Sequence, residues 1–122
     1  MKTQICSTIR INGFHNWPNA LEVVDYLSAR HRHLFTFKVW ADVNHDDRDI
    51  EFQMLQRTIV ECLCDSFDKV EEYLPAIEFE FGSTSCEGIA RKLFGELEKR
   101  NVPVTRIEVW EDDENGASLE KE

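Results

Sequence analysis

The chain has 122 residues, and 24 acidic side chains against 14 basic ones give it a net charge of −10. This length fits a single domain, and a hydrophobic share of 42% is that of an ordinary globular protein. The negative charge disfavours a nucleic-acid duplex or an anionic membrane as a partner, and no apolar run reaches the roughly 20 residues that cross a bilayer.

The first part of the sequence predicts two long strands joined by a short helix. Alternation of apolar and polar side chains over residues 4–14 is typical of a half-buried strand. Pro18 then opens a short helix. Its apolar stripe consists of Ala20, Leu21, Val24 and Leu27. A second strand is predicted from about His31 to Val43, and residues 45–49 form a charged turn.

The rest of the sequence predicts two amphipathic helices and a final strand. Apolar residues at helical spacing indicate one helix from Glu51 to about Cys64 and another over residues 85–101. Between them Pro75 interrupts the pattern, and the apolar and acidic alternation of residues 77–81 marks a candidate edge strand. The last predicted strand runs from Pro103 to Glu111.

This order of elements indicates an α+β fold, because long strands come first, helices next and a strand last. We expect an antiparallel sheet with the two helices packed on one of its faces. Residues 1–111 are predicted to form this single domain. Residues 112–122 are predicted to form an acidic C-terminal tail that is mobile at its end.

The cysteines and the start of the chain both bear on the cellular compartment. The four cysteines lack any C-x-x-C spacing and are Cys6, Cys62, Cys64 and Cys86. We expect them to be free thiols in a reducing compartment. The first residues lead into strand-like sequence rather than a signal peptide, so a cytoplasmic location is predicted.

Three histidines fall on one face of the two long strands. Side chains two residues apart leave the same face of a strand, so His31 and His33 point together, and His15 shares the inward face of the first strand. If these strands pair in antiparallel fashion, the three imidazoles converge, which matches the protein ligands of a catalytic zinc ion. The alternative is that each is a core histidine satisfied by hydrogen bonds within the fold.

Two glutamates are candidate ligand-binding residues. Glu111 ends the last strand on the same face as Ile107 and Val109, where a carboxylate needs a partner. A planar ligand with two adjacent N–H donors, such as a pterin or guanine edge, would supply that partner. The alternative is that Glu111 belongs to the acidic run of residues 111–114 and faces water. Glu87 is either a ligand contact or a favourable charge in the first turn of its helix.

Motifs spread over about residues 7–111 together resemble a known family. They are Gly13-Phe14-His15, His31-Arg32-His33-Leu34-Phe35, Glu51-Phe52 with Leu55, Ser85-Cys86-Glu87-Gly88-Ile89-Ala90, and Val109-Trp110-Glu111. The array is similar to that of the 6-pyruvoyl-tetrahydropterin synthase and 6-carboxytetrahydropterin synthase family.

This resemblance implies the tunnelling fold, in which subunits join their sheets into an oligomeric barrel. Proteins of this kind bind purine-like or pterin-like ligands at subunit interfaces. By the same resemblance, His15, His31 and His33 would be ligands of Zn²⁺. Glu111 would anchor the pyrimidine-like edge of the bound molecule.

Two positions depart from the family's pattern. Leu27 lies four residues before the first histidine of the pair, where family enzymes carry a cysteine. Asp68-Lys69 stands in place of an Asp-His pair. Leucine cannot transfer a proton, so the proton relay of the family would lack two members. Asp68 and Cys86 are the remaining candidates for a catalytic group.

Apart from a purely structural protein, which would bind neither metal nor ligand, two functions remain open from the sequence. One is a metal-dependent homo-oligomer that holds a pterin, purine or nucleotide-like molecule and, if it is an enzyme, acts as a zinc-dependent pterin synthase-like lyase. The other is a noncatalytic binder that sequesters a nucleotide, such as a signalling nucleotide. The missing relay favours the binder, whereas the net charge of −10 disfavours a highly phosphorylated ligand.

Overall fold

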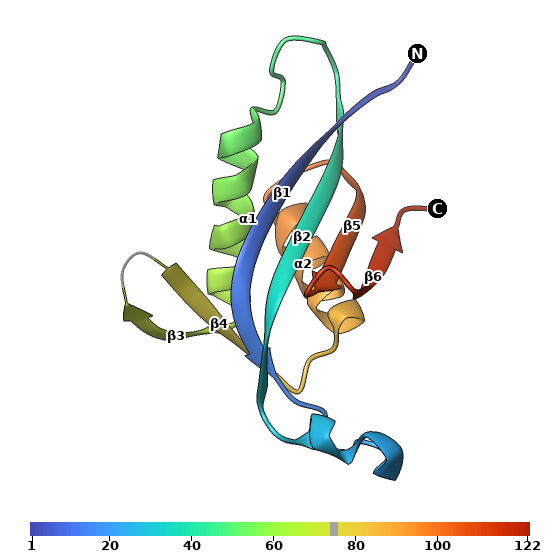
Figure 1. The fold of residues 1–122 in the computed structure, drawn as a ribbon. Coiled ribbons are helices and arrows are strands. Elements are labelled where there is room, and N and C mark those ends of the chain that lie inside the picture. Colours follow the sequence, from blue (N-terminus) through green and yellow to red (C-terminus); the bar gives the residue numbers. More distant parts are fainter. Residues whose placement is uncertain (74–75) are drawn as a thin grey trace.

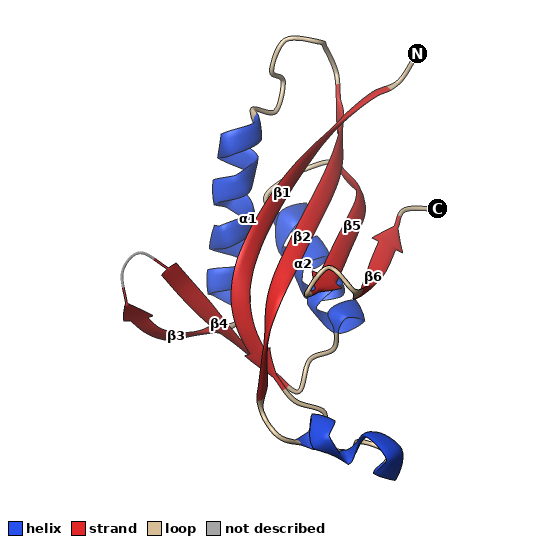
Figure 2. Cartoon of the chain, viewed as in Figure 1, coloured by secondary structure: helices blue, strands red, loops and turns tan. Residues whose placement is uncertain are grey.

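The computed structural model describes residues 1–73 and 76–122, which form a six-stranded sheet with two α-helices behind it (Figures 1 and 2). The elements are β1 (Thr3–His15), the 3-10 helix η1 (Glu22–Ser28), β2 (His31–Val43), α1 (Phe52–Ser66), β3 (Asp68–Tyr73), β4 (Ala76–Gly82), α2 (Cys86–Lys99), β5 (Val104–Glu111) and β6 (Asn115–Glu120). The α+β class is confirmed. None of the helices in the described ranges is long and apolar enough to cross a membrane.

The sheet is mixed, which corrects the prediction of an antiparallel sheet. Its strand order is β3-β4-β1-β2-β5-β6. Each neighbouring pair is antiparallel except β1 and β4, which run parallel. A parallel pair needs a long crossover connection, and the chain between β1 and β4, which includes the whole of α1, supplies it.

The long hairpin of β1 and β2 forms the centre of the sheet. Its register pairs Thr3 with Val43 at one end and His15 with His31 at the other. Gly13 pairs with His33 in the same register. Residues directly opposite each other share a face, so the three histidines lie together at one end of the hairpin, as the sequence predicts.

The core fills the space between the sheet and the two α-helices. From β2, Phe35, Phe37 and Val39 are fully buried. The buried helix residues facing them include Leu55, Ile59 and Leu63 of α1 and Ile89, Leu93 and Leu97 of α2. Both helices are confirmed close to their predicted bounds. Each starts at a side-chain cap, since the carboxylate of Glu51 and the hydroxyl of Ser85 accept backbone N–H groups of the first turn.

The segment between β1 and β2 differs from its prediction. It forms the short helix η1, in which no residue is buried, instead of a helix with a buried stripe. Leu21 and Tyr26 are 63% and 68% exposed. The apolar stripe is present in the sequence, but the segment projects beyond the end of the sheet, where no core lies beneath it (Figure 1).

Two strands lie outside the predicted set. β3 forms the edge of the sheet, so the predicted strand at residues 77–81, now β4, is an inner strand between β3 and β1. Pro75 lies outside the described residues. β6 covers residues 115–120, which the sequence assigns to a mobile tail. It pairs with β5, and Ala117 and Leu119 pack against the core, so the sheet continues past residue 111.

Gly13 is tightly enclosed next to the histidines and tests the packing of this end of the core. A Cβ atom there would overlap the ring of Phe81 and lie 3.0 Å from Cδ2 of Phe35. We expect Gly13→Ala to lower the free energy of unfolding by about 1–3 kcal/mol, because close-packed rings must shift to admit a methyl group. Urea unfolding followed by circular dichroism measures the change.

Gly95→Ala in α2 is the matched control for this substitution. A Cβ atom at Gly95 meets nothing within 4 Å, and alanine is favoured over glycine in a helix by about 1 kcal/mol. This variant should be at least as stable as the wild type. Equal stability of Gly13→Ala and the wild type would contradict the packing described here.

Candidate metal centre

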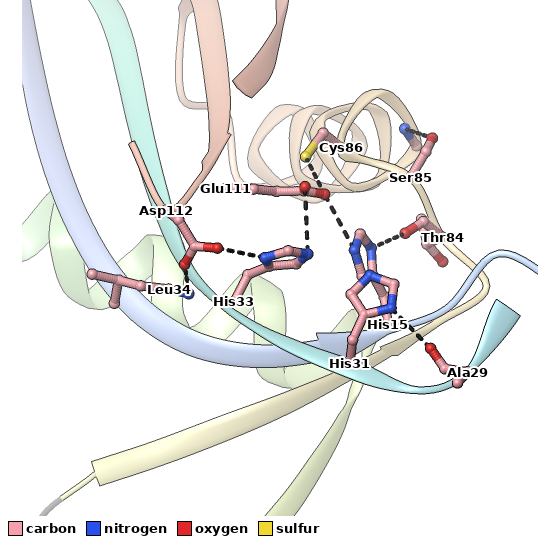
Figure 3. A network of polar contacts seen from close by, with 11 residues as sticks. His15, Ala29, His31, His33, Leu34, Thr84, Ser85, Cys86, Glu111 and Asp112 are labelled. Carbon is pink, nitrogen blue, oxygen red and sulfur yellow. Dashed lines mark hydrogen bonds and ion pairs between the residues drawn. The ribbon is translucent and has the colours of Figure 1, made fainter. Parts of the chain in front are cut away.

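Three imidazole rings converge where β1 ends and β2 begins (Figure 3). The ring centroids are 4.6 Å apart for His15 and His31, 5.1 Å for His15 and His33, and 4.9 Å for His31 and His33. One ring nitrogen from each histidine lies within 4.8 Å of the other two. The convergence predicted from the strand alternation is therefore confirmed.

Each of the three rings is hydrogen-bonded through its Nδ1 atom. The contacts from Nδ1 to oxygen are His15 to the carbonyl of Thr84 (3.1 Å), His31 to the carbonyl of Ala29 (2.8 Å) and His33 to Oδ2 of Asp112 (2.6 Å). All three partners are acceptors, so we assign the proton of each ring to Nδ1. The Nε2 atoms are then left to bind a metal ion.

This donor set fits a transition-metal ion. Neutral imidazoles are ligands for zinc, copper, iron and nickel, and a metal-binding histidine nearly always donates its other N–H to an oxygen. The side chains of His15 and His33 are 11% and 20% exposed, so the nitrogens are partly shielded from water. The alternative of separate core histidines explains the Nδ1 contacts but not the convergence of the three rings.

Asp112 holds His33 from the turn between β5 and β6. Its backbone N–H donates to the backbone carbonyl of Leu34, and its Oδ1 accepts the backbone N–H of Leu34. Both hydrogen bonds are 2.8 Å long. Its Oδ2 therefore stays directed at His33 Nδ1. The hydrogen bonds from His33 and Leu34 lower the pKa of Asp112. Sequence reasoning missed this residue because it places Asp112 in the tail.

The side chain of Glu111 faces the histidines. This position favours a role for Glu111 in the site over the alternative that it only faces water. Its Oε1 lies 3.2 Å from His15 Nε2, and its Oε2 lies 3.5 Å from His33 Nε2. The hydrogen bond with His15 lowers the pKa of Glu111, although burial opposes the shift. Burial alone would lower the pKa of His15, but the hydrogen bonds with Glu111 and Thr84 outweigh it and raise that pKa.

The structure brings Cys86 to the histidines but leaves Asp68 elsewhere. Cys86 opens α2, and its thiol donates to Oε1 of Glu111 at 3.3 Å. Burial, together with the charge and hydrogen bond of Glu111, raises the pKa of Cys86, so the group is a neutral thiol at pH 7. Asp68 pairs with Glu80 at the start of β3, away from the described residues of the pocket. All four cysteines are free.

A pocket of about 630 Å³ opens beside the three histidines. This volume lies in the range of small-molecule sites. The other side chains that matter for its chemistry are Trp17, Tyr26, Leu27, Cys86, Glu87 and Glu111. The pocket therefore combines aromatic and apolar walls with two carboxylates. The predicted ligand-binding residues Glu87 and Glu111 both lie in its lining.

Comparison with known protein families agrees with the fold. The family model of 6-pyruvoyl tetrahydropterin synthase matches residues 14–122. The chain belongs to the 6-pyruvoyl tetrahydropterin synthase family. A search of curated proteins found no match.

Solved structures of low sequence identity share the fold over at least 98% of this chain. The 6-pyruvoyl tetrahydropterin synthase of Caenorhabditis elegans has a TM-score of 0.68 at 10% identity, with 100% of this chain and 97% of that chain covered. An uncharacterised protein of Wolinella succinogenes has a TM-score of 0.63 at 14% identity, with 100% and 99% covered. The 6-pyruvoyl tetrahydropterin synthase of Plasmodium falciparum has a TM-score of 0.54 at 18% identity, with 98% of each chain covered.

Removing the carboxylate that contacts His33 should weaken metal binding. We expect Asp112→Asn to weaken zinc binding by about 10- to 100-fold, because a carboxylate behind a metal-binding histidine orients the ring and raises its basicity. Competition with a chromophoric chelator measures the dissociation constant of the purified protein for zinc.

Asp113→Asn is the matched control in the same turn. Both residues have positive φ, 53° for Asp112 and 56° for Asp113, but the carboxylate of Asp113 accepts the hydroxyl of Thr36. Zinc affinity should be unchanged in this control. An equal loss in both variants would assign the effect to the turn rather than to the support of His33.

Proposed function

We propose that this protein is a zinc-dependent member of its family that binds a pterin- or purine-type molecule in the pocket beside His15, His31 and His33. The orientation of the three rings carries the proposal, because each Nδ1 contacts an acceptor oxygen while the Nε2 atoms of His15 and His33 face the carboxylate of Glu111, an arrangement that a shared ion would satisfy. Bound zinc would act as a Lewis acid that polarises an oxygen of the bound molecule.

The carboxylates of the pocket support a ligand with adjacent N–H donors. Glu111 and Glu87 both line the pocket, and a flat heterocycle with two neighbouring N–H groups would satisfy a carboxylate with a bidentate hydrogen bond. Pterins and guanine present such an edge. The fold neighbours from Caenorhabditis elegans and Plasmodium, which are pterin synthases, agree with this ligand class.

The proposal includes a homo-oligomer in which the sheets of several copies join into a barrel. β3 and β6 are the two outer strands of the described sheet, so their outward backbone groups are available to strands of other copies. We also propose a cytoplasmic location, with which the four free cysteines agree.

A noncatalytic binder that sequesters a nucleotide is the second candidate, and Leu27 favours it. Leu27 lines the pocket, where a side chain without an ionisable group transfers no proton. Cys86 is the only cysteine in the described lining, and its raised pKa keeps the thiol protonated. A pterin synthase-like lyase would instead need a side chain that can transfer a proton in this place. In a related structure, the Plasmodium vivax enzyme, a glutamate is named as a catalytic residue.

The zinc proposal predicts different results for two histidines. We expect His31→Ala to lose stoichiometric zinc and to lower the affinity for pterin, because one of three imidazole ligands is removed. His45→Ala is the control, since His45 is exposed in the loop after β2 and contacts Asp49 instead of the site. Metal analysis and isothermal titration calorimetry with pterin provide the measurements. Unchanged zinc content in His31→Ala would contradict the proposal.

The fate of the bound molecule separates a binder from an enzyme. Because Leu27 cannot transfer a proton, we expect a small molecule that copurifies with the protein to be recovered unchanged after long incubation. Mass spectrometry of the released molecule before and after incubation tests this. A new product that forms with the wild type but not with His31→Ala would instead establish a metal-dependent enzyme.

A further inference from the structure

The carboxylate of Glu111 lies where a fourth metal ligand belongs. We propose that Glu111 completes the metal centre with His15, His31 and His33, so that the coordination shell is closed while the pocket holds no ligand. This inference rests on the proposed zinc site and deepens it. A site with three protein ligands keeps a position open for water or substrate, whereas a site with four does not.

The distances support this assignment. Oε1 of Glu111 lies 3.2 Å from His15 Nε2, and Oε2 lies 3.5 Å from His33 Nε2 (Figure 3). Two ligand atoms bound to one tetrahedral zinc ion, with bonds of about 2.0–2.2 Å, lie about 3.3–3.5 Å apart. The two contacts, at 3.2 and 3.5 Å, thus lie close to this ligand-to-ligand distance and involve two different rings.

The number of N–H groups on His15 and His33 is also compatible with a cation between these rings and Glu111. His15 and His33 each direct Nδ1 at an acceptor oxygen and Nε2 at the carboxylate of Glu111, which is another acceptor. A neutral imidazole has one N–H for its two acceptors, so either a second proton on the ring or a bound cation must face the carboxylate. A cation held between the Nε2 atoms and Glu111 satisfies all three groups while both rings stay neutral.

Neighbouring side chains hold Glu111 in this position. The thiol of Cys86 donates to Oε1 from the first residue of α2. Glu111 and Asp112 are adjacent in sequence and contact the two nitrogens of the same ring, Nε2 and Nδ1 of His33. The end of β5 therefore supplies one ligand and the support for another, as metal sites commonly do.

A closed shell changes how a ligand would enter the pocket. A heterocycle that hydrogen-bonds to Glu111 would draw the carboxylate away from the metal and open a position for an oxygen of that heterocycle. Metal coordination and ligand anchoring would then use the same carboxylate, so each weakens the other by an equal free energy.

Glu111→Gln and Glu87→Gln test the assignment as a matched pair, since both glutamates line the pocket and the second has no contact with the described histidines. In the full-length protein loaded with Co²⁺, Glu111→Gln should change the visible absorption spectrum and weaken metal binding by more than about tenfold. Glu87→Gln should leave both unchanged. A Co²⁺ spectrum and affinity of Glu111→Gln equal to those of the wild type would overturn the assignment.

The wild-type protein provides a second test that does not depend on a variant folding. Azide binds to open positions of Co²⁺ and Zn²⁺ sites, so it should leave the spectrum of the Co²⁺ wild type unchanged. An azide-induced shift in the wild type would show an open position and overturn the closed shell. If the closed shell fails while His31→Ala still loses zinc, the proposed function stands and Glu111 remains the ligand anchor.

Discussion

The antiparallel register of β1 and β2 is the constraint on which the site depends. It sets His15 opposite His31 and Gly13 opposite His33, and a slip of one residue would turn a whole strand's side chains to the other face. Burial of Phe35 and Phe37 against the helices fixes that register. Packing of the core therefore determines where the imidazoles lie, although none of the three rings is itself part of the core.

The orientation of the rings comes from the loops around this rigid hairpin. Thr84 precedes α2, Ala29 follows η1, and Asp112 lies in the β5–β6 turn, so three separate connections each supply one acceptor oxygen. Loops on a rigid scaffold are where binding groups commonly lie. The same arrangement brings the Glu111 carboxylate and the Cys86 thiol to the ring nitrogens from different elements.

The periodicity of apolar residues along the sequence predicts the long strands and the two α-helices, because these elements depend on residues close together in the chain. The alternation at His31 and His33 and the helical spacing of α1 and α2 are visible in the sequence, and the structure agrees with both. Cys86 lies near Glu111 only because α2 packs against β5, a long-range contact that spacing cannot reveal. β6 escapes prediction because the acidic run just before it, residues 111–114, resembles the start of a tail, whereas its pairing with β5 depends on the turn at Asp112.

The central claim is that three histidines, each held through Nδ1, present Nε2 to one metal ion. The most direct measurement is X-ray diffraction from crystals of the zinc-loaded protein, with data collected on both sides of the zinc absorption edge. The account predicts one anomalous peak per chain, bonded to the Nε2 atoms of His15, His31 and His33. A map without a peak between these rings, or with a zinc ion bonded to Nδ1, would contradict it.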